Sequence, residues 1–383
     1  MLGKPSNPGL ACALPAQSRR RRLAINPIDP AHPMKLATYK DGSRDGQLVV
    51  VSRDLSSAHY ATGTATRLQQ VLDDWNFLSP QLQDLYVTLN QGKARHAFAF
   101  EPRQCMAPLP RAYQWAEASA YLNPVALVHR ADGPTFEPVR DAPWVCQGGS
   151  DDFLGPCGDA WFGSETWGID FSAGLAVITG DVGMGASPEQ ALDGVRLLML
   201  ANAWTLCQLA TDERAQGRGR LHSKPAAAFS PVAVTPDELG EGWRRGQVHG
   251  MLRTHWNGQQ VGLMEAGIGM KFHFGQLIAH LAKTRNLRAG TIVGSGPVTN
   301  LEPTKGYASI EEKRGLEALH PGGVTTGWMQ FGDSVRIEMT GRDGLSLFGA
   351  IDQRVSGPGC PAEPGAGNAQ ARAQASAGDA DVA

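Results

Sequence analysis

Short apolar runs and frequent turn residues constrain this chain more than any other feature of its sequence. Even the longest uninterrupted apolar stretches, such as Leu197–Ala201, are far shorter than the roughly 20 residues that cross a bilayer as a helix. Glycine occurs 46 times and proline 25 times, so turns interrupt the chain throughout. Because 42% of the residues are apolar, the chain can still bury a core. The sequence therefore predicts a soluble globular protein with many turns and no membrane span.

The charge balance and the cysteines narrow the class of protein further. Lys and Arg together number 35 and Asp and Glu 37, which gives a formal net charge of −2. This near-neutral balance argues against a nucleic-acid-binding protein, because such proteins need a basic face. The cysteines form no C-x-x-C pair; they are Cys12, Cys105, Cys146, Cys157, Cys207 and Cys360. In a long chain this usage is typical of reduced thiols, so we expect a cytoplasmic protein.

The composition changes near both ends of the chain. Residues 1–33 contain the run Arg19–Arg22 and few acidic residues, which is compatible with a transit peptide. A disordered extension upstream of Met34 explains the same composition and is the interpretation that we favour. Residues 356–383 are rich in Ala, Gly and Pro and predict a disordered tail. Between these ends we expect two domains, at residues 34–139 and 144–355.

Apolar periodicity predicts four helices. The clearest begins at Ser187, a candidate N-cap that precedes Pro188, and runs to about Leu200. The others are expected over Arg67–Trp75, from Ser79-Pro80 to Leu89, and over Phe272–Arg285. Most of the remainder predicts short strands between turns: Lys35–Lys40, Gln47–Ser52, Leu175–Thr179, Val248–Trp256, Thr291–Ser295 and Ser334–Met339.

Several separate segments occur in an order and spacing that resemble one enzyme family, the fumarylacetoacetate hydrolases. The segments are Gln147–Phe153, Trp167–Val177, Ser223–Pro225, Arg288–Pro297 and Ile310–Glu312. The resemblance covers roughly Met34–Val355 and is closest to bacterial members that begin with a strand-rich N-terminal domain. It implies an α+β fold that is mainly β: a roll of mixed β-sheets preceded by a smaller N-terminal domain.

The resemblance also implies a chemistry and a cofactor. Members of the family hydrolyse a carbon–carbon bond in β-diketo acids of the fumarylacetoacetate or acylpyruvate type, in pathways such as aromatic amino acid catabolism. Some relatives decarboxylate, hydrate or isomerise similar substrates. A Mg²⁺ or Ca²⁺ ion chelates the substrate oxygens, because hard cations prefer oxygen ligands and stabilise the developing enolate. The resemblance further implies a homodimer in the cytoplasm.

The metal site is where this chain departs from the family. In the family, four carboxylates bind the metal. They correspond in this chain to Asp152, Ser172, Gly174 and Ala203, so only Asp152 keeps a carboxylate. Each close charge pair contributes several kcal/mol of attraction even when it is screened, so three losses weaken the site severely. Neighbouring acids could substitute, namely Asp151, Asp159 and Asp170. We nevertheless expect a degraded metal site at which binding of Mg²⁺ or Ca²⁺ is doubtful.

The parts of the site that do not bind metal are better preserved. Lys224, in Ser223-Lys224-Pro225, corresponds to a lysine that holds substrate oxygens, and Glu312 to a carboxylate that helps to activate water. The substrate loop corresponds to Ser295, Gly296 and Pro297. The family's usual residue at the last position carries an amide donor that proline lacks.

Three functions therefore stay open at this point. The first is a working family hydrolase, and the second is a catalytically impaired relative that keeps the fold. The third is metal-free chemistry, such as a tautomerisation that uses Lys224 and Glu312.

Overall fold

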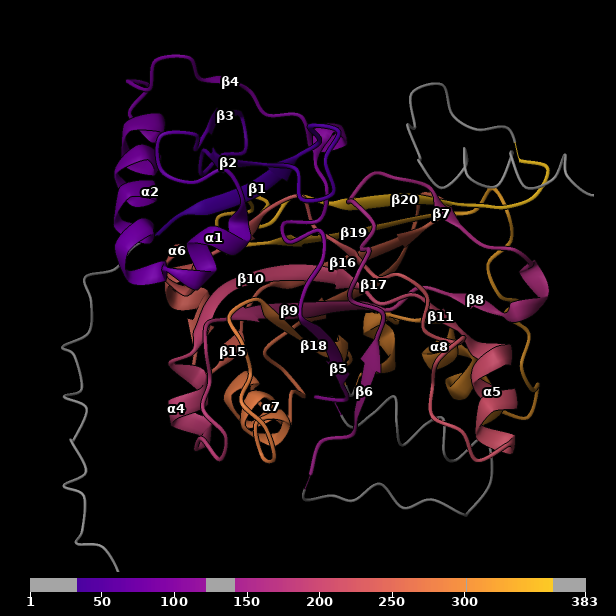
Figure 1. Ribbon diagram of the computed structural model, residues 1–383. Helices are drawn as coiled ribbons and strands as arrows, with labels where there is room; N and C mark the ends of the chain where they lie inside the picture. Colours follow the sequence, from indigo (N-terminus) through magenta and orange to yellow (C-terminus); the bar gives the residue numbers. More distant parts are fainter. Residues whose placement is uncertain (1–32, 122–141, 301, 361–383) are drawn as a thin grey trace, which may run out of the picture. The chain divides into compact units, whose positions relative to one another are not determined.

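The fold is organised around one large open sheet. The computed structural model describes residues 33–121, 142–300 and 302–360. Within these residues an 11-stranded sheet has the order β4-β3-β2-β1-β13-β10-β9-β18-β5-β6, and β12 also pairs with β10. Figure 1 shows β10, β9, β18 and β5 side by side. The bounds are β1 Lys35–Tyr39, β2 Gln47–Val51, β3 Ser57–Tyr60, β4 Phe98–Ala99, β5 Gln114–Ala118, β6 Val145–Gly148, β9 Ala173–Thr179, β10 Val195–Asn202, β12 Ala228–Phe229, β13 Ala233–Val234 and β18 Thr291–Pro297.

A second sheet of five strands has the order β17-β16-β19-β20-β7. Its strands are β7 Ala160–Trp161, β16 Met251–Trp256, β17 Gln259–Glu265, β19 Ser334–Thr340 and β20 Ile351–Ser356. Two small ribbons pair β8 (Ile169–Asp170) with β11 (Thr205–Leu206) and β14 (Trp243–Arg244) with β15 (Gln247–Val248). Most sheet pairs are antiparallel, but β18 pairs with β5, and β20 with β7, in parallel. The mainly-β, mixed-sheet prediction is therefore confirmed for the described residues.

The helices are short and lie between the strands along the chain. They are α1 Leu68–Asp73, α2 Trp75–Asn90, α4 Pro188–Leu192, α5 Cys207–Ala215, α6 Pro236–Leu239, α7 Phe274–Leu281 and α8 Ile310–Ala318. Single 3₁₀ turns occur at Pro102–Gln104, Glu165–Trp167, Gly240–Gly242 and Pro303–Lys305. None of the helices in the described ranges is long and apolar enough to cross a membrane.

The helix expected from Ser187 to Leu200 is wrong over most of its length. Ser187 does cap α4, because its hydroxyl accepts from the amide of Gln190, but α4 ends at Leu192. After a turn at Gly194, residues Val195–Asn202 form β10 instead. This strand is paired on both edges and almost entirely buried, so its apolar residues run continuously. A continuous apolar run does not distinguish a buried strand from a helix, and the sheet pairing decides the outcome.

Two other predicted helices have different ends. The helix expected to open at Ser79-Pro80 begins at Trp75, so Pro80 lies inside α2 and not at its first position. At this position the missing amide removes one intrahelical hydrogen bond. The helix expected over Phe272–Arg285 is shorter, because α7 spans Phe274–Leu281 and His273 stands at its N-cap. The strand predictions are correct to within a few residues, although Val248–Trp256 is divided between β15 and β16.

The large sheet buries apolar side chains on both faces. Along β9, Leu175 and Val177 contribute to one core, while Ala176 and Ile178 contribute to the other. Alternate residues of a strand point to opposite faces, which explains this division. All seven residues of β9 are buried, so a charged side chain beside it needs a partner.

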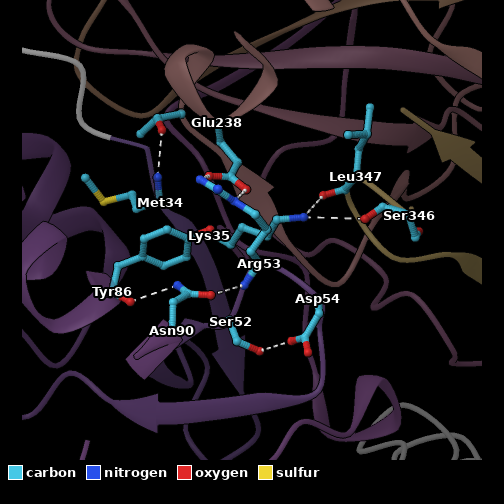
Figure 2. A network of polar contacts seen from close by, with 11 residues as sticks. Met34, Lys35, Ser52, Arg53, Asp54, Tyr86, Asn90, Glu238, Ser346 and Leu347 are labelled. Carbon is cyan, nitrogen blue, oxygen red and sulfur yellow. Dashed lines mark hydrogen bonds and ion pairs between the residues drawn. The ribbon is translucent and has the colours of Figure 1, made fainter. Parts of the chain in front are cut away.

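The first strands join the same sheet as the rest of the chain. Strand β1 pairs with β13, and the Arg53 guanidinium forms two hydrogen bonds of 3.0 and 3.1 Å with Glu238 in α6. Figure 2 shows this pair beside Lys35, whose buried ammonium donates to the carbonyls of Leu347 and Ser346 at 2.7 and 3.4 Å. Burial lowers the pKa of Lys35 to about 8. Backbone pairing and charged contacts thus connect strands β1 to β4 to the rest of the main sheet.

The predicted disordered segments lie almost wholly outside the described residues. The described chain begins at Pro33 and ends at Cys360, and β20 continues to Ser356 at the start of the predicted tail. The two-domain division at residues 34–139 and 144–355 stays a prediction.

Candidate functional site

A buried ion pair between Lys224 and Glu117 forms the centre of the candidate site. The Lys224 Nζ lies 2.5 Å from Glu117 Oε2 and donates to Thr205 Oγ1 at 2.8 Å. The two charged side chains are only 7% and 8% exposed. Two buried charges of opposite sign compensate each other's loss of hydration, whereas either one alone would be costly. The pair therefore fixes an ammonium and a carboxylate inside the fold.

The sheet register explains why Glu117 is there. In β5, Glu117 pairs with Gly294 of β18 on one side and with Cys146 of β6 on the other. Gly294 in turn pairs with Ala176 of β9. Laterally paired residues point to the same face of a sheet, so Glu117 shares a face with Ala176 and with Gly174, two residues earlier. That face contains Gly174, the one expected ligand position that lies within β9.

Lys224 is positioned by Glu213, a residue of α5. Glu213 Oε1 accepts from the amides of Leu221 and His222 at 3.1 and 2.7 Å, and Glu213 Oε2 accepts from the Ser223 hydroxyl at 2.6 Å. Burial raises the pKa of Glu213, but these hydrogen bonds outweigh it and leave the pKa below its ordinary value. One carboxylate therefore holds the three residues that precede Lys224.

The three neutral residues at the expected ligand positions are fixed by hydrogen bonds of their amides or by a close backbone neighbour. The Ser172 amide donates to Asn202 Oδ1 at 2.9 Å, and the Ala203 amide donates to the Ser172 carbonyl at 3.0 Å. A Cβ added at Gly174 would clash with the carbonyl oxygen of Gly296 and lie 3.1 Å from its carbonyl carbon. The space that a ligand side chain needs at position 174 is thus filled by β18. The residues present do not fit the Mg²⁺ or Ca²⁺ site that the resemblance implies.

The remaining predicted ligand, Asp152, lies in the loop after β6 and is exposed. Loss of hydration, together with the neighbouring Asp151 carboxylate, raises its pKa. Asp152 belongs to no group of three potential metal ligands within the described ranges. Its assignment as a ligand stays a prediction.

One such group does occur in the part of the chain that the structure describes. Oxygen and sulfur atoms of Asp170, Cys207 and Glu311 lie within 4.8 Å of one another. Both Asp170 oxygens, however, accept backbone amides at the start of α8, from Ile310 at 2.6 Å and Glu311 at 2.8 Å. Complete burial raises the pKa of Asp170 well above its ordinary value, although these amides lower it. The positive end of a helix disfavours a cation, so this carboxylate acts as a helix anchor.

The predicted substrate loop is built into the sheet. Ser295 is fully buried, and its Oγ accepts from the Leu175 amide at 3.1 Å and donates to the Gly296 carbonyl at 2.7 Å. Gly296 has a φ of +72°, and a Cβ there would clash with the Ala118 carbonyl oxygen. Glycine is therefore required at this position. Pro297 pairs with Gly174, so the loop lies directly against a predicted ligand position.

Glu312 is buried in α8 next to the same region. It accepts from the Thr299 hydroxyl and, at 3.0 Å, from the Ala308 amide. Its own amide donates to Ser309 Oγ at 3.2 Å, and Ser309 forms a backbone bridge with Ser172. Burial raises the pKa of Glu312 to about 7, although both hydrogen bonds to its carboxylate lower it. The catalytic assignments of Glu312 and Lys224 stay predictions.

The raised pKa of Glu312 predicts a pH-dependent stability. The folded state binds the proton more tightly than the unfolded chain, whose pKa is near 4.5, so this contribution is complete below about pH 4.5. It is lost as pH rises through 7, and amounts to about 3 kcal/mol at most. We expect Glu312→Gln to remove this component when urea unfolding is measured from pH 4.5 to 8. Equal pH dependence in wild type and variant would contradict the assignment.

Sequence reasoning missed Glu117, the carboxylate that contacts Lys224. The segment Gln114–Ala118 contains a charged residue between two alanines in a strand that proves to be buried. A carboxylate at such a position needs a buried partner, and that requirement was the available signal. Its partner, Lys224, is more than 100 residues away in sequence, so spacing alone could not join them.

Comparisons with known proteins agree with this architecture. Residues 34–111 match the model for the fumarylacetoacetase N-terminal domain 2, and residues 114–356 match the model for the fumarylacetoacetate hydrolase C-terminal domain. No curated protein matches the sequence.

Solved structures share the fold at low sequence identity. A probable 2-hydroxyhepta-2,4-diene-1,7-dioate isomerase from Mycobacterium abscessus is 16% identical, with a TM-score of 0.59, and covers 86% of this chain and 100% of its own. A fumarylacetoacetate hydrolase from Exiguobacterium antarcticum is 15% identical, with a TM-score of 0.57, and the match covers 85% of this chain and 99% of that protein. A maleylpyruvate hydrolase from Sphingobium sp. SYK-6 is 14% identical, with a TM-score of 0.55, and the match covers 85% of this chain and 100% of that protein. The C-terminal model alone matches more than half of the chain, and the chain therefore belongs to the fumarylacetoacetate hydrolase family.

Proposed function

We propose that this chain binds a small keto or diketo carboxylate at the Lys224 site and does not cleave it by the family's metal-assisted route. The observation that carries the proposal is the closed position at Gly174, where the Gly296 carbonyl fills the space of a ligand side chain. The neutral residues Ser172 and Ala203 also support the proposal, because hard cations need several anionic oxygen ligands. Of the functions left open by the sequence, this is the impaired relative that keeps the fold.

The preserved part of the site supports binding. Lys224 is buried, held in place by Glu213, and directed at Glu117 and Thr205. A buried ammonium is a strong partner for a carboxylate, because both charges are screened little by water. The family description and the relatives' names, which include a maleylpyruvate hydrolase and a dioate isomerase, support a small carboxylate as the ligand class.

Lys224 supplies the cation in this proposal. The ammonium would pair with the ligand carboxylate. The Thr205 hydroxyl oxygen would keep the ammonium oriented by accepting a hydrogen bond from it. A cytoplasmic location and a homodimer are carried over from the family as parts of the same proposal.

The test combines metal titration with a turnover assay on the full chain. We expect calorimetry with Mg²⁺, Mn²⁺ and Ca²⁺ to show no saturable binding at millimolar metal. Acetylpyruvate and fumarylpyruvate should then persist in the presence of each ion. Metal-dependent loss of either diketo acid would overturn the proposal in favour of a working hydrolase that uses Lys224 and Glu312. Turnover that is unaffected by EDTA but abolished by Lys224→Ala would favour tautomerisation instead.

A further inference from the structure

The site contains its own anion. We propose that Glu117 occupies the anion-binding position of Lys224, so that a ligand carboxylate must compete with this internal carboxylate for the ammonium. The inference rests on the proposed function, because it takes Lys224 as the anion-binding group. It adds that the wild-type chain is partly self-blocked and that Glu117 sets which ligands can enter.

Geometry gives Glu117 the contact that a ligand would need. Its Oε2 lies 2.5 Å from the Lys224 Nζ, whereas the other partner of Nζ, Thr205 Oγ1, is neutral. Within the described ranges Glu117 is thus the one charged group in contact with the ammonium. A ligand carboxylate at the same distance would occupy the same side of Nζ.

The backbone leaves Glu117 little freedom to withdraw. Strand β5 is paired with β18 and β6, so the Glu117 backbone is fixed from both sides. Its side chain is 8% exposed, and Glu117 Oε2 also accepts from the weakly polar Cys146 thiol at 3.9 Å. Moving the carboxylate away from Lys224 would leave it buried without a cation, which is costly.

This arrangement predicts a clear order of ligand affinities. An anionic ligand can replace Glu117 at Lys224 only by isolating a buried carboxylate, so its affinity for the wild-type site is low. A neutral ligand gains nothing by replacing Glu117 at the ammonium, because the charges of Lys224 and Glu117 would then both be less well compensated. Removing the Glu117 charge while keeping its volume should therefore free Lys224 for external anions.

The experiment compares anion binding by wild type and Glu117→Gln, with acetylpyruvate and pyruvate as probes in calorimetry. We expect the variant to bind each probe roughly tenfold more tightly or better. The double variant Glu117→Gln/Lys224→Met should lose that gain. Glu338→Gln is the matched control, because it removes a carboxylate from the exposed Arg336 pair and should leave affinity unchanged. Equal or weaker binding by Glu117→Gln overturns the inference.

A rescue measurement covers the case in which Glu117→Gln does not fold. Glu117→Ala leaves a space beside Lys224, and formate is small enough to fill it. We expect sodium formate to raise the Tm of Glu117→Ala above the effect of equal sodium chloride, and to have no such effect in Glu117→Ala/Lys224→Met. No formate-specific rise overturns the inference.

The two proposals fail in different ways. Metal-dependent cleavage by the wild type would overturn the proposed function, whatever Glu117→Gln binds. Absence of the affinity gain, or of the formate rescue where Glu117→Gln does not fold, would overturn the role of Glu117, whether or not the wild type binds a metal.

Discussion

Lys224→Met is expected to destabilise the protein by about 3–5 kcal/mol, because it leaves Glu117 as an uncompensated buried carboxylate. Methionine keeps an unbranched side chain of similar length, so the change removes the charge with little change in packing. The loss should appear in urea unfolding at pH 7 as a lower midpoint with an unchanged slope.

Two further variants separate the charge effect from general damage. Glu117→Gln/Lys224→Met removes both charges, and we expect it to recover most of the lost stability, since replacing a buried pair is often nearly neutral. Lys313→Met breaks the i,i+4 ion pair between Lys313 and Glu317. Because the Lys313 side chain is 38% exposed, the free energy of unfolding should change by less than about 1 kcal/mol. A Lys224→Met effect no larger than that of Lys313→Met would show that the buried pair does not form.

Gly174→Ala is the second change for which a large effect is expected. The new methyl group would overlap the Gly296 carbonyl oxygen and lie 3.3 Å from Ser295 Oγ. The clashing atoms belong to the backbone of β18, which is paired on both edges and cannot yield as a side chain could. We expect a loss of about 1–3 kcal/mol or more, measured by the same urea unfolding.

Gly183→Ala is the control for this substitution, because a Cβ at that position meets nothing within 4 Å. It should leave the unfolding midpoint nearly unchanged. If Gly174→Ala proves as stable as the wild type, β18 can move at this point. Position 174 could then accept a ligand side chain, and that result would contradict the closure of the metal site by β18.

Local patterns predicted the fold well where they were unambiguous. The strands at Lys35–Tyr39, Gln47–Val51 and Ser334–Thr340 follow from short runs of strand-forming residues between turns, and the Ser187 cap follows from its position before Pro188. Val195–Leu200, most of β10, was predicted as helix because a strand buried on both faces has no alternation to reveal it. That information lies in the neighbouring strands β9 and β13 and not in the segment itself.

The candidate site divides in the same way. The motif around Lys224 and the neutral residues at 172, 174 and 203 could be identified from the sequence by resemblance. The closure of position 174 depends on the register shift between Gly294 and Pro297 in β18, which no local pattern encodes. The contact between Glu117 and Lys224 is likewise a product of tertiary structure.

The pairing of β1 with β13 has a consequence for the integrity of the molecule. Strand β1 covers a strand edge that would otherwise face solvent, and Arg53, Glu238 and Lys35 reinforce the junction. A shorter chain that began at residue 114 would leave the backbone of β13 open as a template for other chains. The first strands therefore protect this edge against pairing with strands of other molecules, a task separate from any part they have in ligand binding.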